Sequence, residues 1–453
     1  MWKSSAEMRN SMEKDLTQGS VAKTMLLFAA PMIMGNLLQQ CYNIADTLIV
    51  GKVLGPDALA SVGSAYTLMT FLTSIMIGLC MGSGTVFSVC FGKKDRQKMK
   101  NSILSSFLFI LAVTIIMNIL VFAGIDWILH MMHVPNNIYE LMREYVFIIF
   151  FGIFFVFLYN YFAFLLRAIG NSMTPLFFLG VAAVLNVVLD ILFVVIMRQG
   201  VGGAAFATVI AQAVSGIGIA LYVWLKEPQL RLSKEDFIIK KPTMLEVVRH
   251  SFAACIQQSV MNFGILMIQG LVNSFGTVVM AAFAAAVKID SFAYMPAQEF
   301  GNAFSLFISQ NYGAKKSKRV REGIRKAFKI SVLFCLTVSL VIFIFAPYLM
   351  QIFVNAQEYE IIQIGVGYLR IEGSFYFGIG ILFLLYGFYR GIEKPEMSLI
   401  LTIISLGTRV LLAYLLAPIP AIGVLGIWWS IPIGWILADL AGIVYIKFVK
   451  VFS

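Results

Sequence analysis

Long apolar stretches alternate with short charged segments along the whole chain. Each stretch is long enough to cross the roughly 30 Å of hydrocarbon in a bilayer. Several exceed the length of a perpendicular helix, so tilt, kinks or extensions beyond the membrane are expected. The pattern predicts an all-α membrane protein with twelve transmembrane helices, at residues 24–50, 59–90, 101–124, 144–166, 174–197, 203–225, 250–274, 279–311, 327–347, 361–388, 398–417 and 427–447.

The second half of the chain repeats the first. Arg167-Ala-Ile-Gly170 corresponds to Arg390-Gly-Ile-Glu393, and Gly92-Lys-Lys corresponds to Gly313-Ala-Lys-Lys, each after an apolar stretch of matching length. Two membrane halves in tandem are typical of a transporter that moves one half against the other around a central site. We predict a tail at 1–23, an N-terminal lobe of six helices at 24–225, a linker at 226–249, a C-terminal lobe of six helices at 250–447 and a tail at 448–453.

Composition and charge agree with a lipid environment. Apolar residues make up 60% of the chain and charged residues 13%, with a mean hydropathy of +0.88, so most of the surface must face lipid. The net charge of +11 does not indicate a nucleic-acid partner, because the basic residues are spread between the spans.

The distribution of the 34 Lys and Arg residues predicts the orientation of the chain. Most lie in the tails and in the connections after even-numbered spans, which the positive-inside rule places in the cytoplasm. We therefore expect a multi-pass protein of the cytoplasmic membrane with both termini inside. The exceptions are Lys52, Arg143 and Arg198 at the opposite side, and Lys288, Arg370 and Arg409 within spans.

Neither cysteine nor histidine spacing indicates a metal site. The five cysteines lie in apolar runs and form no C-x-x-C, which favours packing roles over disulfides or metal ligation. His130 and His133 are one turn apart in a predicted outer connection, but no further ligand accompanies them. We predict no metal and no cofactor.

Carboxylates inside spans are candidates for function, because each costs at least ~2.5–3.5 kcal/mol on insertion scales. Asp439 lacks a polar companion at helical spacing, which favours a structural role. Lys288 and Asp290 face different sides of one helix, so they are poor partners. The full set is Asp46, Asp190, Asp290, Glu299, Glu372 and Asp439.

Asp46 ends a polar face of the first span. The residues of this face recur at intervals of three and four, so they stack on one side of a helix. Pro31 removes a backbone hydrogen bond in mid-helix, which allows either a hinge or a static kink. The face consists of Pro31, Gly35, Gln39, Tyr42 and Asp46.

Asn186 and Asp190 are one turn apart on the fifth span, and Thr208 follows early on the sixth. Measured from the predicted span ends, these residues and Asp46 all lie in the outer half of the membrane. Carboxylate, amide and hydroxyl oxygens suit a hard monovalent cation, and two adjacent acids can also hold a proton. We predict a cation site there. The equivalent positions of the second half are Met267, Arg409, Ala413 and Ile431, so the set is not repeated.

The second half carries a different polar group. Glu372 either neutralises Arg409 or binds a cationic substrate, and Glu299 is a further member of this predicted C-terminal polar site. Gly78, Gly82 and Gly84 form a small-residue face typical of close helix packing and not of a nucleotide loop.

Several stretches resemble the multidrug and toxic compound extrusion (MATE) family over nearly the whole chain. They are Pro31-Met-Ile-Met-Gly-Asn-Leu-Leu-Gln-Gln-Cys-Tyr-Asn-Ile-Ala-Asp-Thr47, Asn186-Val-Val-Leu-Asp190, Gly202-Gly-Ala-Ala-Phe-Ala-Thr208, Phe91-Gly-Lys-Lys and Gln310-Asn-Tyr-Gly-Ala-Lys. The resemblance implies two six-helix lobes in a V around a central cavity, and antiport of organic cations against Na⁺ or H⁺.

The acid of the first span and the Asn-x-x-x-Asp of the fifth resemble the DinF-like branch, which implies an N-lobe cation site at Asp46, Asn186, Asp190 and Thr208. The resemblance also implies that Pro31 is the position at which the first helix bends. The implied substrate-cavity residues are Met32, Asn36, Gln39 and Tyr42. The chain departs from the other branch, which uses acids on helices 7 and 10, because helix 7 has none.

The sequence thus predicts an exporter of amphipathic, cationic compounds that is surrounded by membrane lipid and functions as a monomer. One alternative is a flippase for lipid-linked precursors, which needs several cations in its cavity; only Lys288, Arg370 and Arg409 could serve. The other alternative is an intramembrane enzyme. The sequence disfavours it because it contains no H-E-x-x-H and no nucleophile-elbow motif.

Overall fold

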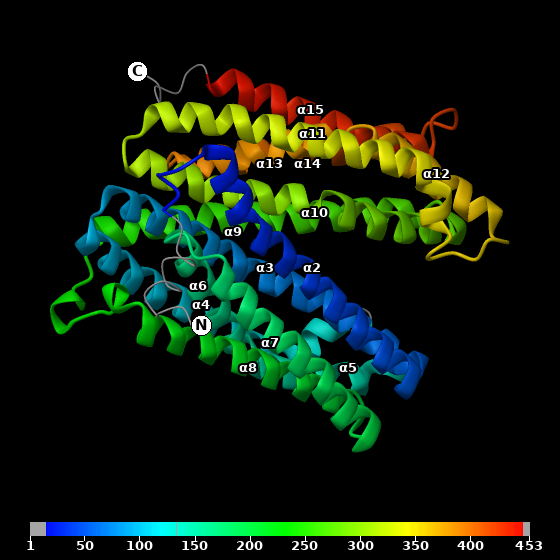
Figure 1. The fold of residues 1–453 in the computed structure, drawn as a ribbon. Coiled ribbons are helices and arrows are strands. Elements are labelled where there is room, and N and C mark those ends of the chain that lie inside the picture. The colour runs from blue at the N-terminus through cyan, green and yellow to red at the C-terminus, as the bar shows by residue number, and fades with distance from the viewer. Residues whose placement is uncertain (1–14, 133, 447–453) are drawn as a thin grey trace, which may run out of the picture. The chain divides into compact units, whose positions relative to one another are not determined.

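The computed structural model describes residues 15–132 and 134–446, and within these ranges the regular structure is helical, without strands (Figure 1). In the part of the chain that the structure describes, ten helices are long and apolar enough to span a membrane, and counting each of two bent helix pairs as one span gives up to twelve. The predicted all-α fold with twelve spans is confirmed. The helices are α2 Val21–Leu54, α3 Pro56–Lys93, α4 Arg96–Met131, α5 Asn136–Phe151, α6 Ile153–Ala168, α7 Met173–Asp190, α8 Gly200–Lys226, α9 Lys241–Asn273, α10 Thr277–Gly313, α11 Ser317–Met350, α12 Tyr359–Gly373, α13 Tyr376–Gly391, α14 Pro395–Leu416 and α15 Val424–Ile446.

Two spans predicted as single helices are broken. The fourth span bends by 45° between α5 and α6, and the tenth by 51° between α12 and α13. At the first break, a Cβ on Gly152 would collide with the side chain of Gln212 on α8, so glycine permits this close approach. The first break interrupts an apolar run that hydropathy alone cannot divide, whereas the second lies at Gly373-Ser374, directly after Arg370 and Glu372.

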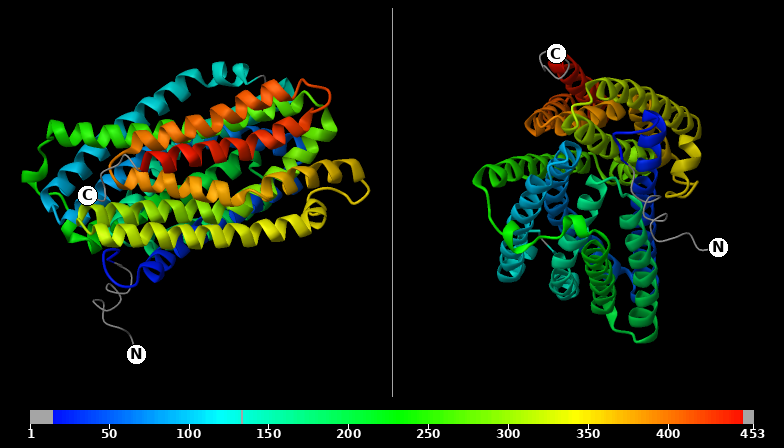
Figure 2. Two further views of the ribbon diagram at one scale, coloured as in Figure 1. Left: turned by 90° about the horizontal axis from the view of Figure 1, so that it is seen from above. Right: turned by 60° about the vertical axis from the view of Figure 1, so that its left-hand side comes forward.

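The helices form two compact units. Unit 1 contains Ala30–Cys255, and unit 2 contains Leu16–Ala29 and the chain from Ile256 onward. In unit 1, α3 packs against α4, α5 and α6, while α8 packs against α5, α6 and α7. In unit 2, α10 packs against α11, α12 and α13, and α14 lies beside α15. In Figure 2, α10 is green and the helices after it run from yellow-green to red.

The units differ from the predicted lobes at two short segments. Helix α2 begins in unit 2 and passes into unit 1 between Ala29 and Ala30, and α9 begins in unit 1 and passes into unit 2 after Cys255. Pro31 therefore lies next to the boundary within α2. The predicted tail at 448–453 lies outside the described residues.

The first turns of α9 fit against the glycine face of α3. A Cβ on Gly78 would lie 2.6 Å from the Cα of Cys255, and one on Gly82 would collide with the backbone of His250. The hydroxyl oxygens of Ser83 and Ser251 are 2.8 Å apart in the same interface. The small residues predicted to allow close packing do so here, because any larger side chain would push α9 away.

We expect Gly78→Ala to lower the thermal stability of the purified protein, because overpacking against backbone atoms costs about 1–3 kcal/mol. Gly63→Ala on the same helix is the matched control, since no atom lies within 4 Å of its added Cβ. The difference in unfolding midpoint is measured by heating each variant in detergent and recording how much monodisperse protein remains. Equal midpoints for the two variants would show that α3 and α9 do not pack this closely.

The segment before α2 is held by the connection between α10 and α11 in unit 2. Leu16 is fully buried, and its backbone N–H donates to Gln310 Oε1 at 3.1 Å. The Asn311 amide donates to the Leu16 carbonyl at 3.1 Å, and the Arg319 guanidinium donates to the carbonyls of Leu16 and Gly19 at 3.1 and 2.6 Å. These bonds anchor the start of α2.

The linker has the corresponding attachment in unit 1. Asp236 accepts from Lys100 Nζ at 2.8 Å, and Asn101 donates to the Ile238 carbonyl. The Lys100 ammonium and the Ser233 hydroxyl hold the pKa of Asp236 well below its usual range, so this anchor stays charged at neutral pH. The predicted linker at 226–249 thus contains two short 3₁₀ turns, Pro228–Leu230 and Lys234–Asp236, and the start of α9.

Candidate functional site

Unit 1 brings the four predicted cation ligands together. Asn186 and Asp190 lie in the last turns of α7, where both are buried. Asn186 Nδ2 donates to Thr208 Oγ1 of α8 at 3.3 Å, and Thr208 donates to the Ala204 carbonyl at 3.1 Å. Asp46 of α2, which is half-buried, has its carboxyl group within interaction range of Asp190.

Helix geometry changes at the same point. After Asp190 the chain continues as a π-helix, Ile191–Ile196, in which the Met197 N–H bonds to the Leu192 carbonyl at 2.8 Å. Single π turns within α-helices occur frequently at functional sites, because they alter the direction in which side chains project. Hydropathy gives no signal for this change, since the run is apolar throughout.

Four oxygen atoms of this group have no hydrogen-bond partner in the described part of the chain. They are Asp46 Oδ1, Asn186 Oδ1 and both carboxylate oxygens of Asp190, each inaccessible to solvent. The carboxyl groups of Asp46 and Asp190 also interact with each other. Buried polar atoms of this kind require a partner, and a proton or a hard monovalent cation provides one for several oxygens at once.

Tyr145 of α5 was missed in the sequence. It is buried and lies within electrostatic range of Asp46, Asp190 and Tyr42. Tyr145 lies in an apolar and aromatic run without polar residues at helical spacing, so the sequence does not distinguish it from a packing residue.

The predicted cavity residues differ in exposure along α2. Gln39 is exposed and contacts the half-buried Tyr42, whereas Met32 is buried and Asn36 is half-buried. Tyr42 also lies within electrostatic range of Tyr66 and Tyr159, which adds aromatic rings to this face. Its role in substrate binding remains a prediction.

A second polar group lies inside unit 2. Asp290 of α10 and Glu372 of α12 are both buried, and the Tyr376 hydroxyl of α13 donates to Asp290 Oδ1 at 2.6 Å. Arg409 of α14 interacts electrostatically with both acids. The partnership of Asp290 with Glu372 was not predicted, because more than 80 residues separate them in the chain.

Glu299 has partners outside this group. It lies nine residues beyond Asp290 on α10, or about 13 Å along the helix. It accepts from Asn302 Nδ2 at 3.3 Å, and Asn302 Oδ1 in turn accepts from buried Arg390 at 3.0 Å. The structure thus gives Glu299 partners other than Glu372 and Arg409, and its part in a shared C-terminal polar site stays a prediction.

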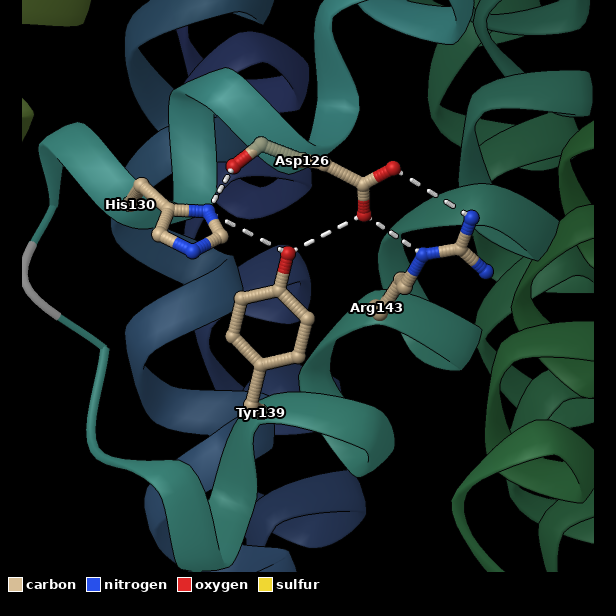
Figure 3. Close-up of polar contacts among 4 residues, drawn as sticks. All are labelled: Asp126, His130, Tyr139 and Arg143. Carbon is tan, nitrogen blue, oxygen red and sulfur yellow. Dashed lines mark hydrogen bonds and ion pairs between the residues drawn. The ribbon is translucent and has the colours of Figure 1, made fainter.

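His130 takes part in a polar cluster between α4 and α5 (Figure 3). Asp126 pairs with Arg143 at 2.7 Å and accepts from the Tyr139 hydroxyl at 3.0 Å, while His130 Nδ1 donates to the Asp126 carbonyl at 2.6 Å. His133 lies outside the described residues. Within the described ranges no group of three His, Cys, Asp or Glu side chains is placed to hold a metal ion.

Comparison with known proteins places this arrangement in a family. The family model described as MatE matches residues 31–192 and 251–415, one segment in each half. The chain belongs to the MATE family. Its relatives include the probable multidrug resistance protein YpnP of Bacillus subtilis, 31% identical over 86% of this chain and 87% of that protein. The probable multidrug resistance protein NorM of Thermotoga maritima is 26% identical over 90% and 88%.

Solved structures show the same MATE fold. A MOP superfamily transporter from Pyrococcus furiosus superposes with a TM-score of 0.90 at 24% identity, covering 96% of this chain and 97% of that one. The chain is thus a multi-pass membrane transporter of small molecules in a multidrug efflux family, and it is not an enzyme. MATE transporters work without a cofactor.

Proposed function

We propose that this MATE protein is a secondary antiporter that exports amphipathic, cationic compounds in exchange for Na⁺ or H⁺, with the cation site of the DinF-like branch in its N-terminal half. The observation that carries the proposal is the set of unsatisfied buried oxygens on Asp46, Asn186 and Asp190. Two acids without a resident countercharge bind a cation or a proton reversibly, which a coupling site requires.

Helix α2 links the ion to the conformational change. It carries Asp46 and Tyr42, and Pro31 leaves the Leu27 carbonyl without its usual helical partner beside the boundary between the units. Cation binding at Asp46 and Asp190 favours the state that releases substrate outward, and drug loading from inside follows cation release. The two ligands must favour different states, because a ligand shifts an equilibrium only by its differential affinity.

The flippase alternative is less well supported. It needs a cluster of cations, but Lys288 Nζ lies over the Phe353 ring and the Arg370 guanidinium lies over the Phe343 ring, 5.9 and 5.2 Å from the ring centroids. Each cation thus has an aromatic neighbour of its own instead of facing a shared anion site.

A resistance profile tests the proposal. The protein is expressed in a host without its own efflux pumps, and accumulation of cationic dyes and drugs is measured with the Na⁺ gradient and then the proton gradient dissipated. We expect export to stop when one of these two gradients, the one that drives it, is dissipated. Export that survives loss of both gradients would contradict antiport.

The proposed orientation, with both termini and the α3–α4 and α10–α11 connections in the cytoplasm, has a direct test. In a Cys41→Ser background, Arg96→Cys and Lys318→Cys should not react with an impermeant thiol reagent in intact cells, whereas Glu140→Cys should. All three positions are exposed on the protein, so any difference in reaction reports sidedness. Labelling of Arg96→Cys or Lys318→Cys in intact cells would reverse the topology.

A further inference from the structure

The acids of unit 2 lie at the break of the tenth span. Glu372 is in the last turn of α12, and Tyr376 is the first residue of α13 after the 51° bend. Asp290 accepts a hydrogen bond from Tyr376 on one side of the bend and interacts with Glu372 on the other. With exposures of 3% and 2%, Asp290 and Glu372 are shielded from solvent.

The positive charge around Asp290 and Glu372 does not balance two ionised carboxylates. Arg409 is the cation that interacts with both Asp290 and Glu372, and the nearby Lys288 turns its ammonium toward Phe353. Among the described residues, neither acid forms an ion pair within 4 Å of Arg409, and Glu372 Oε2 has no hydrogen-bond partner. The other titratable groups around them are the hydroxyls of Tyr294, Tyr368 and Tyr376.

Two ionised carboxylates beside one guanidinium would leave a net negative charge inside unit 2. Such an uncompensated buried charge is strongly unfavourable, and a bound cation or a proton removes it. Arg409 would repel a metal cation at the same place. A proton needs no coordination shell, and as a carboxylic acid hydroxyl it can be shared between two adjacent carboxyl groups.

We propose that Asp290 and Glu372 form a second ion-binding site, which holds one proton shared between the two carboxyl groups and connects α10 to both sides of the bend between α12 and α13. The site is separate from Asp46 and Asp190 and does not depend on antiport. Release of the proton would leave two like charges, one on α10 and one in the last turn of α12 beside the bend, so a change in the α12–α13 angle accompanies release.

Infrared spectroscopy of the purified protein at neutral pH tests the proposal without drug or gradient. Subtracting the spectrum of Asp290→Asn from that of the wild type should reveal the loss of about one carboxylic-acid carbonyl band that shifts in heavy water. Glu372→Gln should show the same loss, because either substitution leaves one acid for one guanidinium. If the subtraction shows only a carboxylate band for both variants, no proton is bound and the proposal fails.

Two further variants make the result specific. Arg409→Gln removes the countercharge and should add about one more carboxylic-acid band, because both acids must then be protonated. Asp439→Asn on α15 is the matched control for a buried acid of the same unit; it should leave the Asp290-dependent band unchanged. An unaltered band in Arg409→Gln would overturn the charge argument. The two proposals are tested independently. Drug accumulation can contradict antiport while the spectra still show the shared proton, and the spectra can show no proton while antiport is observed.

Discussion

Asp46→Asn and Asp190→Asn are each expected to abolish gradient-driven export while leaving membrane insertion and protein yield intact. Each substitution removes a charge that the coupling ion must neutralise, and the remaining acid alone cannot provide the same site. The helices should not unfold, because a neutral amide is cheaper to keep in lipid than a carboxylate. The loss of export is measured as drug accumulation in cells matched for expression. Accumulation in cells with a dissipated gradient defines zero export.

Two controls separate coupling from the general effect of losing a buried acid. Asp439→Asn should export at the wild-type rate, since Asp439 is a buried acid of unit 2 that interacts with no second carboxyl group among the described residues. Glu372→Gln should retain detectable ion-dependent export. Full export by either Asp46→Asn or Asp190→Asn would remove the proposed coupling site from unit 1.

Arg319→Gln is expected to release the segment that precedes α2. Arg319 donates to the carbonyls of Leu16 and Gly19, and each hydrogen bond from a charged group contributes about 1.5–3 kcal/mol. Loss of one such bond raises the open population roughly ten- to hundredfold. Trypsin cleavage after the exposed Lys23 should accelerate by a comparable factor, measured by the mass of the large fragment.

Lys318→Gln is the matched control for this experiment, because it removes a positive charge one residue earlier from an exposed position. Its cleavage rate should equal that of the wild type. Similar acceleration in both variants would mean that net charge, and not the bonds to the backbone carbonyls, protects the start of α2.

The spans and the unit 1 site could be predicted from the sequence because each leaves a local pattern. Hydropathy marks lipid-facing helices, and helical spacing places Asp190 beside Asn186 and aligns Asp46 with Tyr42. The break at Gly152 leaves no such pattern, since apolar residues continue through the bend. The break near Ser374 follows Arg370 and Glu372, but polar residues within a span do not by themselves specify a bend.

Other features depend on contacts between distant residues. The partnership of Asp290 with Tyr376 joins helices from separate parts of the chain, and no periodicity reports it. The start of α9 at Lys241 was also not predicted, because its polar residues lie outside the hydrophobic window although the backbone is helical. Hydropathy measures immersion in lipid, and it does not measure helix length.

The exchange of short segments between the units has a consequence for how the two halves arose. Each half begins with a segment, Leu16–Ala29 in one case and the residues up to Cys255 in the other, that packs within the unit formed mainly by the other half. An isolated half would expose the surface that receives this segment, including the glycine face at Gly78 and Gly82. A half-length ancestor could cover that surface only with the segment of a second copy, as in a domain-swapped homodimer. Gene fusion would then have made an existing obligate partnership covalent.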